Sequence, residues 1–202
     1  MHFKVSKNNI KLGAIPNINT LACGKTCGNV PCAKYCYAKH GNYLYENVKK
    51  RLTENLLAYL ENPKRTENEI LLQLPIYGYV RWHSSGEIID EDYLKMMVRI
   101  AKRLPKVNFL CFTKKYKIVN DYISKCKAQK KKAIPNNLTI VLSQWWEDYG
   151  LENPYNLPMS YVYNKAINNT VPTPTFECSG NCEKCLKCWH MQKGDTVVFN
   201  KH

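Results

Sequence analysis

The sequence has no uninterrupted run of about 18 apolar residues, the length that a membrane-spanning helix needs. Its nearest approach to one, residues 70–80, is broken by Gln73, Pro75 and Gly78. Residues 1–9 contain neither an apolar segment nor a small-residue cleavage site, so they do not resemble a secretory signal. These absences predict a cytoplasmic protein without a membrane partner, in a compartment where thiols stay reduced.

Recognisable catalytic motifs are also missing. The 9 glycines form no phosphate-binding loop, and no nucleophile stands in a known motif with His and an acid. Arginine is scarce, since the 30 basic residues comprise 25 Lys and 5 Arg. Specific contacts to phosphates and bases rely mainly on Arg, so the net charge of +14 only weakly favours an anionic partner such as nucleic acid. The densest basic run, residues 125–132, is interpreted as a solvated helix end, with a nucleic-acid patch as the alternative.

Cysteine, by contrast, is abundant, with 10 in 202 residues. In a reducing compartment such cysteines are more often metal ligands or nucleophiles than disulfide partners. Eight of them stand in two groups, at residues 23–36 and 178–188. Cys111 and Cys126 stand alone, and we expect both to be ordinary core residues.

The first group has gaps of three and four residues, with glycine and proline supplying turns within one loop. Short, even gaps are typical of an iron–sulfur cluster, whereas structural zinc usually takes two close pairs separated by a longer finger. The loop also has too few apolar residues to bury four thiols. It therefore predicts a [4Fe-4S] cluster, with zinc as the alternative, on the candidate ligands Cys23, Cys27, Cys32 and Cys36.

The second group has the gap pattern of a bacterial ferredoxin in reverse order. It predicts a second iron–sulfur site, again with zinc as the alternative, on Cys178, Cys182, Cys185 and Cys188. A single cluster that takes ligands from both groups, and so joins the two ends of the chain, is the rival geometry. His190 is a further candidate ligand, with a plain surface histidine as the simpler interpretation.

Between the two groups the chain alternates between helical and strand periodicity. The expected helices span residues 45–60, 66–72, 90–104 and 118–126, and the expected strands span 76–82, 107–112, 138–142, 159–163 and 196–199. Such alternation implies right-handed crossovers and a parallel sheet. The chain is short for a closed eight-unit barrel of about 250 residues. We therefore expect an α/β fold, a partial (βα) barrel or an open parallel sheet, as a single domain over residues 1–202. Residues 1–170 would form the α/β part and residues 171–202 a cysteine-rich extension.

Other candidate residues fall at the ends of expected strands. Arg81 and His83 would project toward a ligand, with a structural pairing to Glu87 as the alternative. Lys114 can hold an anionic substrate or the carboxylate of a cofactor, with a solvated turn as the alternative. Strand alternation places Trp145 and Trp146 on opposite sides, so that one lies in the core and the other lines a pocket.

The first group also resembles a known signature. The stretch Cys27-x4-Cys32-x2-Tyr35-Cys36-Tyr37 is similar to the radical S-adenosylmethionine motif Cys-x3-Cys-x-aromatic-Cys, with each gap one residue longer. In that superfamily the loop follows the first strand of a partial barrel, and three cysteines leave one iron open for the cofactor. Residues 84–87, Ser-Ser-Gly-Glu, resemble its Gly-Gly-Glu turn. The resemblance implies S-adenosylmethionine as a cofactor, an auxiliary cluster at the second group, and the cofactor-binding candidates Tyr37, Ser85, Gly86, Glu87 and Lys114.

Four short motifs are similar to small phage and plasmid proteins of the gene-product-eighty-eight family. They are Asn9-x-Lys11-Leu12-Gly13, the cysteine motif of residues 27–38, Arg81-x-His83-x-Ser85-Gly86-Glu87, and Cys188-Trp189. This resemblance implies an iron–sulfur protein with a radical-SAM-like barrel. Two departures from the radical motif are the longer cysteine gaps and a candidate fourth ligand, Cys23, which would leave no iron open.

Two functions follow as hypotheses. The first is a compact radical-SAM-like enzyme that takes electrons from a donor protein and abstracts hydrogen from a substrate, with Arg81 and His83 as the catalytic candidates. The second is a non-catalytic iron–sulfur or zinc protein with closed four-cysteine sites, which binds nucleic acid or a protein partner through its basic surface.

Overall fold

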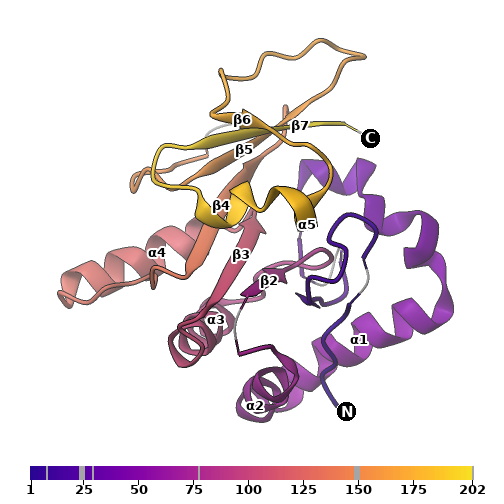
Figure 1. The fold of residues 1–202 in the computed structure, drawn as a ribbon, viewed down its shortest axis with the longest axis vertical. Helices are drawn as coiled ribbons and strands as arrows, with labels where there is room; N and C mark the ends of the chain where they lie inside the picture. The colour runs from indigo at the N-terminus through magenta and orange to yellow at the C-terminus, as the bar shows by residue number, and fades with distance from the viewer. Residues whose placement is uncertain (8, 23–25, 29, 77, 148–150, 202) are drawn as a thin grey trace.

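The computed structural model describes residues 1–7, 9–22, 26–28, 30–76, 78–147 and 151–201. The predicted ligand Cys23 lies outside these residues. The described strands form one parallel sheet in the order β1-β2-β3-β4-β5-β7-β6 (Figure 1). Their bounds are Asn17–Ile18, Gly78–Trp82, Val107–Thr113, Leu138–Gln144, Met159–Tyr163, Phe176–Glu177 and Thr196–Asn200 for β1 to β7. The sheet is open, with β1 and β6 at its edges, and the predicted α/β fold with a parallel sheet is confirmed at this level.

Four helices cover one face of the sheet. They are α1 (Glu46–Glu61), α2 (Pro63–Gln73), α3 (Glu91–Arg103) and α4 (Tyr116–Ala128). Alternate strand residues such as Val80, Trp82, Phe109 and Cys111 face them and are fully buried in one large core. Because crossovers between parallel strands are right-handed, consecutive strands with neighbouring positions place their helices on the same side. The expectation that Cys111 is a core residue is confirmed.

The structure corrects the predicted start of α2. The sequence pattern predicts a start at residue 66, but Thr66 lies inside the helix. Asn62 is the N-cap, and its side chain accepts a hydrogen bond from the Arg65 backbone N–H at 2.9 Å. Pro63 occupies the first helical position, where its missing N–H costs nothing. Helix α2 therefore begins three residues earlier than predicted, directly after Asn62, which also ends α1.

The C-terminal cysteine-rich segment covers the opposite face of the sheet (Figure 1). It contains the short helix α5 (Cys182–Cys185) and the 3₁₀ turn η4 (Lys187–His190). Trp189, 3% exposed, packs on the sheet with Leu110 and Val141, donates its indole N–H to the Val80 carbonyl at 3.0 Å, and accepts a bond from the Thr139 hydroxyl at its own carbonyl. The strands are thus buried on both sides, which explains why they are almost continuously apolar.

The N-terminal turn at residues 9–13 meets α5. The Cys182 backbone N–H donates to the Lys11 carbonyl at 3.0 Å, and the Ala14 N–H donates to the Glu183 carboxylate at 3.1 Å. Gly13 has a left-handed φ of +58°, and a Cβ atom at this position would lie 1.9 Å from a Glu183 oxygen. The chain ends are therefore joined by these contacts, and the glycine of the Asn9–Gly13 motif is required by this approach.

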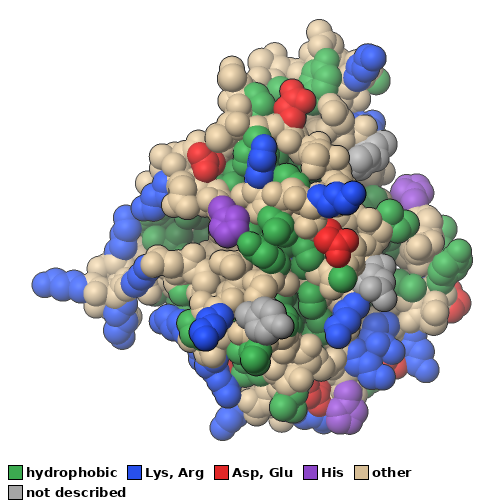
Figure 2. All heavy atoms as spheres, in the orientation of Figure 1, with side chains coloured by type: hydrophobic (Ala, Val, Ile, Leu, Met, Phe, Trp, Pro, Cys, Tyr) green, Lys and Arg blue, Asp and Glu red, His purple; other side chains and the backbone are tan. Residues whose placement is uncertain are grey.

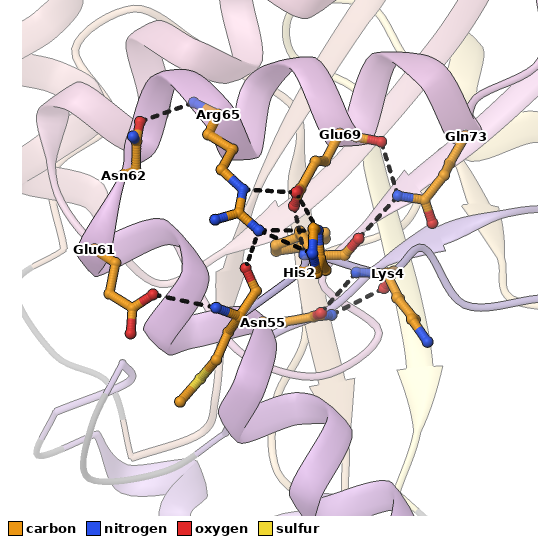
Figure 3. Close-up of polar contacts among 10 residues, drawn as sticks. His2, Lys4, Asn55, Glu61, Asn62, Arg65, Glu69 and Gln73 are labelled. Carbon is orange, nitrogen blue, oxygen red and sulfur yellow. Dashed lines mark hydrogen bonds and ion pairs between the residues drawn. The ribbon is translucent and has the colours of Figure 1, made fainter.

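The first residues of the chain are fastened to α1 and α2 by side-chain hydrogen bonds (Figure 3). Asn55, fully buried in α1, accepts from the Lys4 backbone N–H and donates to the Lys4 carbonyl, at 2.8 and 2.9 Å. Glu69 and Gln73 of α2 hold the backbone of residues 3–5 in the same way. The N-terminal segment thereby enters the sheet at a fixed position and leads into β1.

The basic run of residues 125–132 lies at the C-terminal end of α4, as predicted, and Lys and Arg side chains gather there (Figure 2). Lys125, Lys127 and Lys130 to Lys132 are exposed or partly exposed around this end. Within the described ranges, no helix is long and apolar enough to cross a membrane.

We predict that Trp189→Ala destabilises the protein by about 3–5 kcal/mol, because the large buried ring fills the space between η4 and the sheet. The free energy of unfolding is measured by urea titration. The matched control is His190→Ala, an exposed neighbour on the same turn, which should change this free energy by about 0.5 kcal/mol or less. Equal effects of the two substitutions would contradict the packing role of Trp189.

Candidate functional site

A cavity of about 620 Å³ lies at the carboxyl ends of the strands. In open parallel sheets this edge is the usual ligand-binding position, because the connecting loops converge there. The cavity brings together Cys27, Cys32 and Cys36 from the first cysteine group with Arg81, Gly86 and Lys114 from the ends of β2 and β3. Candidate residues from the sequence that are 45 to 87 positions apart along the chain therefore line one cavity.

The cysteine loop follows β1 and runs through the 3₁₀ turns η1 (Pro31–Tyr35), η2 (Tyr37–Lys39) and η3 (Gly41–Leu44). Three contacts fasten it to the strand ends. The Tyr37 and Tyr43 hydroxyls both donate to the Ser84 carbonyl, the latter at 3.2 Å, and the Lys115 ammonium donates to the Cys27 carbonyl at 3.2 Å. The cysteine loop is thus held against the cavity wall by its contacts with the Ser84 carbonyl after β2 and with the Lys115 side chain after β3.

Hydrogen bonds hold the Ser-Ser-Gly-Glu turn of residues 84–87 against the end of β1. Ser84 donates to the side-chain oxygens of Asn17 and Asn19 at 2.8 and 2.9 Å, and the Ser85 hydroxyl donates to the Thr20 carbonyl at 3.1 Å. Gly86 has a φ of +89°, and a Cβ atom there would lie 2.1 Å from the Thr20 hydroxyl oxygen. A glycine is therefore required for the close approach of this turn to the end of β1.

Glu87 connects the end of β2 to the end of β3. Its carboxylate accepts from the Thr113 hydroxyl at 2.6 Å and from the backbone N–H groups of Lys114 and Ile88, both at 2.8 Å. Burial raises the pKa of Glu87, and these hydrogen bonds oppose the rise. Its carboxylate is consequently committed to positioning the two strand ends.

His83, the residue after β2, lines the cavity. Its φ is +57°, a left-handed value, and its ring stacks on Tyr93 with the centroids 5.6 Å apart. The Nε2 atom lies 3.2 Å from the Tyr93 hydroxyl and the Nδ1 atom lies 3.6 Å from the Cys111 sulfur. Burial, followed by the nearby Arg81 charge, lowers the pKa of His83 to about 3, so the ring is neutral at physiological pH. The described contacts do not pair it with Glu87.

Arg81 and Lys114 face the cavity from neighbouring strands. The Arg81 guanidinium lies over the Phe112 ring, 4.4 Å from its centroid, and donates from Nε to the Trp82 carbonyl. Its two terminal nitrogens donate no hydrogen bond to any described residue. The Lys114 ammonium donates to the Ser143 carbonyl at 3.0 Å. Both cations are therefore held at defined places on the wall.

The expectation that Trp145 and Trp146 point to opposite sides is wrong. Their ring centroids are 4.1 Å apart, and both rings contact Tyr35 of the cysteine loop. Strand β4 ends at Gln144, so the alternation of side chains stops before these residues. Trp145 lines the cavity, as one of the two was expected to do.

The second cysteine group does not line this cavity. It lies on the face of the sheet opposite helices α1 to α4, here called the inner face. Cys178, Cys182, Cys185 and Cys188 line one small crevice of about 20 Å³ beside Trp189. Burial raises the pKa of Cys182 and raises that of Cys188 to about 12, and the neighbouring thiols of the group contribute to both rises. His190 is exposed and lies 3.2 Å from the Tyr79 hydroxyl.

In the described part of the chain, no three His, Cys, Asp or Glu side chains are gathered closely enough to hold a metal ion as they stand. A cluster on either group would therefore draw its thiols together as it binds. Such coupling of loop structure to metal loading is general for small metal sites.

The sequence model of the gene product 88 family matches residues 3–191. The chain belongs to the gene product 88 family. The match includes both cysteine groups, the Asn9–Gly13 turn and the Ser84–Glu87 turn. Comparison with curated proteins and with solved structures finds no significant match in either set.

Several residues that shape the site in this gene product 88 family member escaped the sequence analysis. Asn17, Asn19 and Asn55 are buried polar residues that lie outside any motif, and only their low exposure identifies them. Phe199 and Lys201 line the cavity from β7, close to the C-terminal end of the described chain. A signal for Phe199 did exist, since it is the last apolar residue of a predicted strand.

We predict that His83 makes stability depend on pH. Because its pKa is about 3 when folded and 6.5 ordinarily, the unfolded chain binds the proton first, and stability falls as pH drops below 6.5. The expected slope is up to about 1.4 kcal/mol per pH unit. The test compares urea unfolding of the native protein and His83→Asn between pH 7 and pH 4, since Asn tolerates the left-handed φ. The variant should show the shallower slope, and equal slopes would contradict the prediction.

Proposed function

We propose that this member of the gene product 88 family is a radical-SAM-like iron–sulfur protein. In this proposal Cys27, Cys32 and Cys36 hold a [4Fe-4S] cluster, and the cavity beside them binds S-adenosylmethionine. The observation that carries the proposal is that these three cysteines line the same 620 Å³ cavity as the Ser84–Glu87 turn, at the carboxyl edge of an open parallel sheet.

The donor set fits the cluster. Thiolates are the usual protein ligands of iron–sulfur clusters, and three of them on one loop leave one iron without a protein ligand. The loop is fastened at Tyr37, Tyr43 and Cys27, and its three cysteines line the cavity. When reduced by a donor protein, such a cluster supplies one electron to the bound S-adenosylmethionine.

In this proposal, residues around the cavity bind the cofactor and position the cysteine loop. Lys114 provides a positive charge for the carboxylate of the cofactor, while Ser85 and Gly86 shape the wall along which its amino-acid portion lies. Tyr37 holds the loop against the turn, and Glu87 acts by positioning, because its oxygens are engaged by Thr113, Lys114 and Ile88. Neutral His83 closes the floor without exchanging a proton at physiological pH.

The second cysteine group is proposed to hold an auxiliary cluster. Its four cysteines share one crevice, and α5 carries two of them directly against the N-terminal turn. A closed site with four thiolates there would brace α5 and η4 on the inner face of the sheet. Zinc in this site is the alternative, and metal analysis separates the two.

We predict that Cys27→Ala, Cys32→Ala and Cys36→Ala each remove about four iron and four sulfide per chain from protein reconstituted without oxygen. Electron paramagnetic resonance of the reduced native protein should change when S-adenosylmethionine is added, and dithionite should start its cleavage. Cys126→Ala is the matched control, because this cysteine lies on α4 outside both groups and should keep the full metal content. An unchanged spectrum with no cleavage would overturn the S-adenosylmethionine part of the proposal.

We further predict that Cys185→Ser lowers iron and sulfide from about eight to about four of each per chain. It should also lower the melting temperature, since α5 connects the inner face of the sheet to the N-terminal turn. The spectral response to S-adenosylmethionine should persist. A colourless native protein that contains zinc and no sulfide would contradict both cluster assignments.

A further inference from the structure

We propose that the β7 side of the cavity binds a nucleotide, as the substrate or as the terminal unit of the substrate. The base would lie against the aromatic side chains Tyr35 and Trp145, and the phosphate would lie among the cations Lys11, Arg81 and Lys201. The inference deepens the proposed function, since it names the substrate class of that site, but nucleotide binding itself requires no cluster.

On the β7 side of the cavity, aromatic rings and cationic side chains alternate along the floor. Arg81 lies over Phe112, whose ring meets Phe199 edge-on with the centroids 5.4 Å apart, and Lys11 lies over Phe199, 4.7 Å from its centroid. All four residues line the cavity. The row joins residues of β2, β3 and β7 with Lys11 of the N-terminal turn.

The wall is an aromatic cluster beside the cysteine loop. Tyr35 and Trp145 stack with an interplanar angle of 20° and with their centroids 5.9 Å apart, and Trp146 packs against both. The Lys201 ammonium lies 4.5 Å from the centre of the Tyr35 ring. Tyr35 is 42% exposed, so the cluster offers an apolar surface with this cation above the Tyr35 ring.

The charge of the cavity favours an anion. Among its described lining residues are the cations Lys11, Arg81, Lys114 and Lys201, while the one acid, Glu87, has its carboxylate engaged by three hydrogen bonds. The terminal nitrogens of Arg81 have no described acceptor, and they form the fork that binds phosphate oxygens well.

A nucleotide matches both features. Its base has two flat faces that stack on aromatic side chains regardless of sequence, and its phosphate supplies the negative charge. The volume is within the range of about 300–1,000 Å³ that small-molecule sites occupy. Phe199 and Lys201 line the cavity from the β7 side, whereas the Ser84–Glu87 turn lines it from the end of β2.

The test is calorimetric titration of the reconstituted protein, saturated with S-adenosylmethionine, with adenosine 5′-monophosphate and with adenosine. We expect the monophosphate to bind at least tenfold more tightly than adenosine. Trp145→Ala should weaken it roughly tenfold, and Trp145→Phe should retain most of the affinity. Lys201→Gln should weaken it several-fold, whereas Lys64→Gln, on the exposed surface of α2, should leave it unchanged.

A second titration uses a six-nucleotide single strand in place of the monophosphate. Tighter binding of the strand, still sensitive to Trp145→Ala, would identify a nucleic-acid end as the source of the nucleotide, and tighter binding of the monophosphate would identify a free nucleotide. Binding of neither, equal losses for Lys201→Gln and Lys64→Gln, or displacement by S-adenosylmethionine would overturn the inference.

Iron and sulfide are measured on the same preparations, which separates the two proposals. A full cluster content without nucleotide binding overturns the substrate assignment alone. Nucleotide binding that follows the variants as expected, in protein that takes up no iron or sulfide, overturns the proposed function alone.

Discussion

The hydrogen bonds of Asn19 are the interaction on which the candidate site depends. Asn19 links the end of β1 to the end of β2 and to α1. It is 4% exposed, and its oxygen accepts from both the Ser84 hydroxyl and the Ser85 backbone N–H, while its backbone carbonyl accepts from Asn55 of α1. Leaving such buried groups unpaired costs about 1–3 kcal/mol each, so the end of β2 has a strong preference for one position against β1. The Ser84 carbonyl then receives Tyr37 and Tyr43, and the cysteine loop is placed by the same contacts.

The inner face of the sheet imposes a second constraint. In a closed barrel this face would be filled by its own strands, but an open sheet of short strands needs a separate cover. Here the cover is the cysteine-rich segment, with Trp189 inserted among residues of β3 and β4. Helix α5 in turn contacts the N-terminal turn through Glu183, which places Gly13 beside the second cysteine group. The cover leaves the carboxyl edge of the sheet open, where the cavity lies.

The sequence predicted those helices and strands whose pattern of apolar residues matches the faces that are buried in the fold. The stripe of α3, capped by Asp90, and the apolar runs of β3 and β4 follow directly from periodicity, because both helix and strand faces are buried here. It missed β1, because a strand of two residues, paired with Arg81 and Trp82, is too short to show a period of its own. The cavity members were found through motifs, whereas the network of Asn17, Asn19 and Asn55 exists only through contacts distant in sequence.

The titratable groups of the cavity also limit the chemistry that its wall can perform. Glu87 accepts three hydrogen bonds from the protein, and burial keeps His83 neutral over the whole physiological pH range, so neither is available as a general acid or base. What the wall offers instead is thiols on one side and cations with aromatic rings on the other. Such a site can bind and orient a ligand, and in the proposed function its reactivity comes from a bound cluster. That division of roles supports cluster-dependent radical chemistry at the cysteine side and recognition of an anionic, planar substrate at the β7 side.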